Sequence, residues 1–175
     1  MTLPNWLSLA RILLIPVFMV VLLGDVPHGD YVAVAVFSLA ALTDKLDGYL
    51  ARSRGATTTI GIFLDPLADK LLVSAALISL VELGRLAAWV AMVIIAREFM
   101  VSGLRMVAAS QEVVIAASQW GKLKTVTQVV AIAALIVDNP PHTATTVLVA
   151  LAVAVTIWSG VEYFVDARYV LRTPA

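Results

Sequence analysis

Apolar residues occur along this chain in long stretches that short polar turns interrupt. A helix of about 20 apolar residues is long enough to cross the hydrocarbon core of a bilayer, and the sequence contains six stretches near that length. The expected helices are Trp6–Leu23, Tyr31–Leu50, Ile60–Leu83, Leu86–Ala108, Trp120–Val137 and Thr143–Val165. We therefore predict an all-α integral membrane protein, with six transmembrane helices in one bundle and a single domain over residues 1–175.

Composition favours the same class of protein and argues against others. Of the 175 residues, 61% are hydrophobic, and the mean hydropathy of +0.97 exceeds that of a typical soluble domain. The chain has no Cys, so neither disulfides nor thiolate chemistry is expected. A net charge of zero argues against a nucleic-acid partner. The first stretch lacks a basic leader and a small-residue cleavage site and contains Pro16, so it is not expected to be a cleaved signal peptide.

The basic residues fall unevenly on the two sides of the predicted bundle. Eleven of the twelve lie on the side that also holds both chain termini, and only Arg85 lies on the other. Basic residues concentrate on the cytoplasmic side of membrane proteins. The sequence therefore predicts a multi-pass protein of the cytoplasmic membrane with both termini in the cytoplasm.

Acidic residues form one stripe on each of two neighbouring predicted helices. The first stripe, at spacings i, i+3, i+4 and i+7, consists of Asp44, Asp47, Gly48 and Ala51. The second, at spacings i, i+4 and i+8, consists of Gly61, Asp65 and Asp69. These spacings place each set on one face of a helix. Because a short polar segment connects the two helices, we expect the stripes to face each other at one depth, at the cytoplasmic face.

Four carboxylates that converge near a membrane need cations or protons. A single carboxylate at bilayer depth already costs a few kcal/mol. Ligands that offer only oxygen favour a hard cation, Mg²⁺ or Mn²⁺. The alternative is a structural ion-pair network with the neighbouring basic residues Lys45, Arg52, Arg54 and Lys70. Gly48 and Gly61 on the acidic faces favour a ligand site, because they allow close approach of a ligand or backbone.

Basic residues also gather on the fourth and fifth predicted helices, at the same side as the acidic stripes. They are Arg97, Arg105, Lys122 and Lys124. They are either counter-ions for the carboxylates or a pocket for an anion. Bound metal ions would already neutralise the carboxylates, so we favour the anion pocket. Arg52 and the hydroxyl-rich segment 53–59 leave a similar choice between phosphate or head-group contacts and a structural or solvated role.

The spacing of eight residues resembles the signature of the CDP-alcohol phosphotransferase family. These residues are Asp44, Asp47, Gly48, Ala51, Arg52, Gly61, Asp65 and Asp69. Further segments are similar to the branch of that family that makes phosphatidylglycerophosphate, and this likeness extends to about Gln128. They read LPNWLSLARI, DGYLAR, FLDPLADKLLV, REFMVSGLR and GKLKT.

The resemblance implies a six-helix membrane transferase, usually a homodimer, with two metal ions at a cytoplasmic active site. It would join CDP-diacylglycerol to sn-glycerol 3-phosphate and release CMP. Asp69 would be the catalytic base, and the metal ligands would be Asp44, Asp47, Asp65 and Asp69. The CDP-diacylglycerol site would consist of Gly48, Ala51, Arg52, Thr57 and Gly61. The acceptor's phosphate would bind Arg97, Arg105, Lys122 and Lys124.

Three alternatives remain open at this point. A cardiolipin synthase or a phosphatidylinositol-phosphate synthase of the same family would keep the aspartates and change the acceptor. A cation transporter belongs to a different class. It would need polar groups through the full depth of the membrane, whereas the far halves of the predicted helices are almost entirely apolar.

Overall fold

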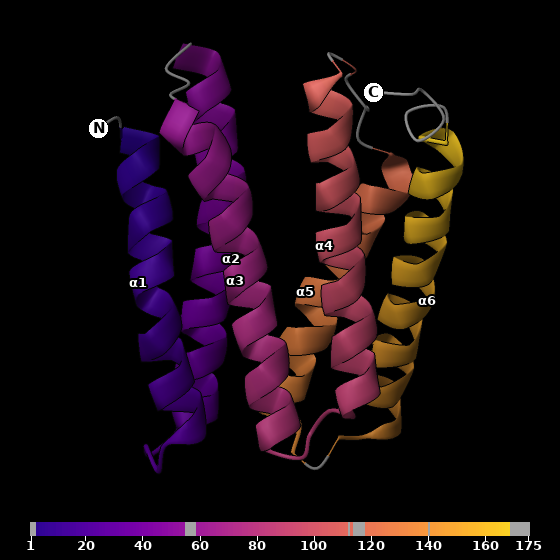
Figure 1. Ribbon diagram of the computed structural model, residues 1–175. Helices are drawn as coiled ribbons and strands as arrows, with labels where there is room; N and C mark the ends of the chain where they lie inside the picture. The colour runs from indigo at the N-terminus through magenta and orange to yellow at the C-terminus, as the bar shows by residue number, and fades with distance from the viewer. Residues whose placement is uncertain (1–2, 55–58, 112, 114–117, 140, 169–175) are drawn as a thin grey trace.

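Helices alternate in direction along the chain and lie side by side in one bundle (Figure 1). The computed structural model describes residues 3–54, 59–111, 113, 118–139 and 141–168, without the side chains of residues 3–5 and 44–65. The described residues form six helices: α1 (Leu3–Leu23), α2 (Gly29–Arg54), α3 (Thr59–Glu82), α4 (Ala88–Ser110), α5 (Gln119–Val137) and α6 (Thr143–Asp166). The expected helices are therefore confirmed, and most boundaries agree within a few residues.

Turn residues set where the helices end. At the end of α3, Gly84 adopts φ +68°, a left-handed conformation that glycine accepts readily. The N–H of Gly84 donates to the carbonyl of Val81, and the N–H of Arg85 donates to the carbonyl of Leu80. This is the Schellman pattern, which satisfies the last carbonyls of a helix. It reverses the chain within a few residues and brings α4 back along the bundle.

The helices form two groups of three that meet along the middle of the bundle. In one group α1 contacts α2 and α3, and in the other α6 contacts α4 and α5. Contacts of α2 with α5 and of α3 with α4 join the groups. Small residues allow close packing of helices within a bilayer, and several buried positions are alanines: Ala33, Ala40, Ala68, Ala76, Ala91, Ala131 and Ala152.

Large apolar side chains also cover the outside of the bundle. Leu13, Val20, Trp89, Met92 and Val161 are all more than half exposed. Extended apolar surface of this kind is unusual on a soluble monomer. Within the described residues, three helices are long and apolar enough to cross a membrane: Trp6–Leu23, Gln119–Val137 and Thr143–Asp166. Six spans and their orientation remain predictions.

Arg85 connects three segments at the end of the bundle away from the start of α1 and the end of α6 (Figure 1). Its Nη1 and Nη2 each donate to one carboxylate oxygen of Asp30, both at 3.0 Å. Nη1 also donates to the carbonyl of Ile136 at 2.6 Å. Paired bonds of this kind between guanidinium and carboxylate are strong and directional. The one basic residue that the sequence separates from the others thus joins the start of α2, the turn before α4 and the end of α5.

Asp138 connects the end of α5 to the first turn of α6. Its carboxylate accepts hydrogen bonds from the hydroxyl of Thr145, from the backbone N–H of His142 at 2.7 Å and from the ring of His142. These bonds, with that from Thr145 first, lower the pKa of Asp138 from 3.8 to about 2. The folded state therefore favours the ionised carboxylate over the protonated one.

We expect Asp138→Asn to lower the thermal unfolding midpoint near neutral pH. Because folding depresses this pKa, the carboxylate's contribution is complete above pH 3.8 and disappears as the pH falls through about 2. As the pH falls from 3.8 to about 2, the difference in unfolding midpoint between Asp138→Asn and the unmutated protein should therefore disappear. Circular dichroism of the detergent-solubilised proteins measures it. Asp25→Asn is the control, since Asp25 is exposed in the loop after α1. A difference that stays constant with pH would contradict the prediction.

Candidate active site

A polar cavity of about 280 Å³ lies among α3, α4, α5 and α6. It lies toward the end of the bundle where α4 ends and α5 begins, away from Arg85 (Figure 1). Its charged lining residues are five basic and two acidic: Asp69, Lys70, Arg97, Glu98, Arg105, Lys122 and Lys124. The structure therefore brings together the predicted base and all four predicted phosphate-binding residues, which come from three helices.

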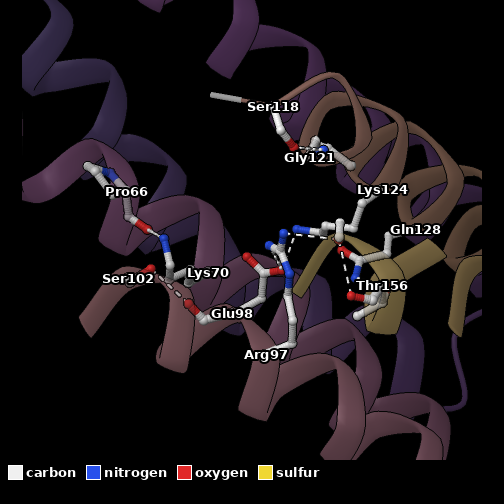
Figure 2. Close-up of polar contacts among 12 residues, drawn as sticks. Pro66, Lys70, Arg97, Glu98, Ser102, Ser118, Gly121, Lys124, Gln128 and Thr156 are labelled. Carbon is white, nitrogen blue, oxygen red and sulfur yellow. Dashed lines mark hydrogen bonds and ion pairs between the residues drawn. The ribbon is translucent and has the colours of Figure 1, made fainter. Parts of the chain in front are cut away.

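Glu98 lies at the centre of the buried part of this cavity wall (Figure 2). Its Oε1 forms ion pairs with Nζ of Lys124 and, at 3.3 Å, with Nη1 of Arg97. The side chains of Glu98, Arg97 and Lys124 are only 12%, 10% and 7% exposed. Glu98 was not among the site residues predicted from the sequence. The sequence does hold a signal for it: Glu98 directly follows Arg97 and is an acidic residue among the basic residues of the fourth predicted helix.

Arg97 is held from a second side by α6. Its Nη2 donates to the hydroxyl of Ser159 at 3.0 Å, while its buried Nε has no hydrogen-bond partner among the described residues. A Cβ atom on Gly160 would lie only 3.2 Å from Cγ of Arg97. The small residues of α6 therefore make room for the arginine. Arg97 therefore links α4 to α6 and also lines the cavity.

Arg105 and Lys122 differ from the buried Arg97 and Lys124. Both are exposed, and neither side chain makes a hydrogen bond or an ion pair to another described residue. Ser118 caps the start of α5 by accepting a hydrogen bond from the N–H of Gly121 at 3.0 Å. Lys122 therefore lies close to the N-terminus of α5, where the helix dipole favours anions. Among the described residues, these two side chains are the exposed cations that line the cavity from α4 and α5.

A buried contact between α5 and α6 lies one turn further along α5 than Lys124. The side chain of Gln128 donates to the hydroxyl of Thr156 at 3.0 Å, and that hydroxyl donates to the carbonyl of Ala152 at 2.6 Å. All three residues are buried, and none of them lines the polar cavity. This contact stabilises the packing of the two helices beneath Lys124 (Figure 2).

Most of the predicted metal and nucleotide site has no described side chains. The structure places Asp44, Asp47, Gly48, Ala51 and Arg52 in α2, and Gly61 and Asp65 in α3, which confirms the helices that the two stripes require. Their side-chain positions, and Thr57 altogether, lie outside the described residues. Asp69 is the one predicted ligand whose side chain is described. Within the described residues, no three acidic or His side chains gather into a metal site.

Comparisons with known proteins agree on one family. The family model for CDP-alcohol phosphatidyltransferase matches residues 1–158. A Bacillus subtilis protein named CDP-diacylglycerol–glycerol-3-phosphate 3-phosphatidyltransferase is 44% identical, over 98% of this chain and 97% of its own length. A Haemophilus influenzae protein of the same name is 37% identical, over 94% and 92%. A Mycobacterium tuberculosis protein named probable phosphatidylglycerophosphate synthase is 42% identical, over 94% and 81%.

We expect two Gly→Ala substitutions to differ because only one of these glycines lies against another side chain. At Gly103 in α4, a Cβ meets no described atom within 4 Å, so Gly103→Ala should raise stability by about 0.5–1 kcal/mol through helix propensity. At Gly160, the new Cβ would displace Arg97 and its bond to Ser159, so Gly160→Ala should gain less or lose stability. Thermal unfolding of both variants in detergent measures the difference. Equal gains would show that Arg97 does not depend on the space at Gly160.

Proposed function

The chain belongs to the CDP-alcohol phosphatidyltransferase family, and we propose that it transfers a phosphatidyl group from CDP-diacylglycerol to sn-glycerol 3-phosphate. The products are phosphatidylglycerophosphate and CMP. The names of its relatives support this pair of substrates. The observation that carries the proposal is the cavity that joins Asp69 to the cations of α4 and α5.

The charge of the cavity fits a phosphomonoester. Its lining has three more basic than acidic residues. A phosphomonoester carries about −1.5 to −2 charges near neutral pH and offers three strong acceptor oxygens. A phosphodiester such as phosphatidylglycerol carries a single charge. The exposed Arg105 and Lys122 would bind the phosphate oxygens, and the buried Lys124 would complete the site.

Asp69 is positioned to act on the acceptor's hydroxyl. It lines the same cavity from α3, whereas the four cations predicted to bind phosphate line it from α4 and α5. With the phosphate held by the cations, the primary hydroxyl of glycerol 3-phosphate would extend toward α3. Its oxygen attacks the phosphorus that carries the lipid, the bond from that phosphorus to CMP breaks, and the hydroxyl proton passes to the carboxylate of Asp69. Positioning supplies much of the rate in such transfers.

The acidic residues of α2 and α3 fit divalent cations, because they offer carboxylate oxygens alone. Asp44, Asp47, Asp65 and Asp69 would hold Mg²⁺ or Mn²⁺. When bound, the ions would neutralise the pyrophosphate of CDP-diacylglycerol and the departing CMP. The rest of the nucleotide site would consist of Gly48, Ala51, Arg52, Thr57 and Gly61.

The apolar surface and the charge distribution support a membrane location. We propose six spans in the cytoplasmic membrane, with both termini and the active site at the cytoplasmic face. A homodimer is part of the same proposal.

A CMP-release assay tests the proposed reaction. The purified protein in detergent receives CDP-diacylglycerol and Mg²⁺ with one acceptor at a time: glycerol 3-phosphate, phosphatidylglycerol or inositol phosphate. We expect release with glycerol 3-phosphate. Release with phosphatidylglycerol alone would identify a cardiolipin synthase, and release with inositol phosphate alone would identify the inositol enzyme. No release with any acceptor, together with cation uptake into proteoliposomes, would identify a transporter.

We expect Asp69→Asn to remove nearly all turnover while keeping much of the metal-dependent binding of CDP-diacylglycerol. The amide keeps the shape of the side chain but cannot accept the proton. Turnover is measured by CMP release, and binding is measured by isothermal titration calorimetry. Asp166→Asn serves as the control, since Asp166 is an exposed carboxylate at the end of α6. Full turnover in Asp69→Asn would exclude its role as the base.

We expect Arg105→Ala to raise the KM for glycerol 3-phosphate by about tenfold, or about 1.4 kcal/mol. The KM for CDP-diacylglycerol should change little, because Arg105 lines the cavity from α4 and the proposed nucleotide site lies mainly on α2 and α3. Steady-state kinetics with each substrate varied in turn measure the two constants. Arg168→Ala, an exposed arginine that does not line the cavity, should leave both unchanged. An equal rise in both constants would contradict the assignment of Arg105 to the acceptor.

A further inference from the structure

We infer that Glu98 is a positioning residue for the acceptor site, because it holds the ammonium group of Lys124 in the wall of the cavity. The inference rests on the proposed function and adds a residue that neither the family signature nor the charge pattern assigned. Glu98, Lys124 and Asp69 all line the same cavity.

Lys124 needs such a partner for two physical reasons. Its ammonium is a point charge on a flexible stem of four carbons, so it has no fixed direction of its own. Its side chain is also only 7% exposed, and a buried charge without a counter-charge is strongly destabilising. The ion pair with Oε1 of Glu98 gives the ammonium both a fixed direction and a counter-charge.

Glu98 is itself held by a chain of contacts that reaches α6. Its Oε1 also pairs with Nη1 of Arg97 at 3.3 Å, and Nη2 of Arg97 donates to Ser159 at 3.0 Å. The position of Lys124 on α5 is thereby linked through α4 to α6 (Figure 2). A carboxylate fixed in this way can place the ammonium in one position before the acceptor arrives.

A second role for Glu98 would have the opposite kinetic effect. If Glu98 only competed with the acceptor's phosphate for Lys124, removing its charge would strengthen acceptor binding. If Glu98 positions Lys124, removing its charge weakens acceptor binding, because the ammonium loses its place. The direction of the change in KM for glycerol 3-phosphate therefore separates the two roles.

The test compares Glu98→Gln, Glu98→Asp, Lys124→Met and the double variant Glu98→Gln/Lys124→Met with the unmutated protein. Glu98→Gln should raise the KM for glycerol 3-phosphate by about tenfold, within the usual range of coupling between contacting residues. The KM for CDP-diacylglycerol should stay unchanged. Glu98→Asp keeps the charge and should show a smaller rise. The double variant should match Lys124→Met, because Glu98 acts through Lys124.

Gln128→Met is the matched control. It removes a buried hydrogen bond between α5 and α6 one turn away from Lys124 and leaves the cavity lining intact. It should lower the thermal unfolding midpoint and leave both KM values unchanged. If it shifted the KM for glycerol 3-phosphate as much as Glu98→Gln does, the effect would be one of helix packing, and the inference would be wrong.

Further outcomes would also overturn the inference. They are a fall or no change in the KM for glycerol 3-phosphate in Glu98→Gln, and equal rises in both KM values. Glu98→Asp keeps a carboxylate beside Lys124 and Arg97, so the direction of its change in KM keeps the test decisive if Glu98→Gln does not fold. A double variant with a higher KM than Lys124→Met would show that Glu98 acts independently of Lys124. Failure of the proposed function appears separately, as unmutated protein that does not consume glycerol 3-phosphate.

Discussion

The buried ion pairs of Glu98 are the interaction on which the candidate active site depends. The surrounding bundle is apolar, and charges within it are costly unless they are paired. One carboxylate serves two cations here, and Ser159 binds the outer side of Arg97. This arrangement leaves the group of three with a net positive charge, so it can attract an anion and still remain buried. The exposed Arg105 and Lys122 add charge where solvent lowers its cost.

The helices and their order were predictable from the sequence, because apolar stretches and turn residues are local signals. The gathering of Asp69 with the cations of α4 and α5 was also predictable. Because the helices alternate in direction, the end of α4, the start of α5 and the first half of α3 lie toward the same end of the bundle (Figure 1). That conclusion needs only the direction of each helix and the position of each residue along it.

The partners within the cavity wall were not predictable in this way. Arg97 and Ser159 are 62 residues apart, and their contact depends on how α4 and α6 are rotated about their axes. The role of Gly160 depends on the same rotation, because Gly160 leaves space for the side chain of Arg97 on another helix. The sequence predicts that Arg97 binds phosphate, but it gives no sign that Arg97 also contacts Glu98 and Ser159.

The two groups of helices carry different parts of the proposed chemistry. Asp69 belongs to the group of α1, α2 and α3, and the four cations predicted to bind phosphate belong to the group of α4, α5 and α6. The distance between the proposed base and the proposed phosphate site thus depends on how the groups are joined. At the far end, Arg85 joins them firmly, because it binds Asp30 of α2 and the carbonyl of Ile136 in α5. Movement of one group against the other is therefore restrained at the end away from the cavity. The cavity lies toward the opposite end, where its lining comes from helices of both groups.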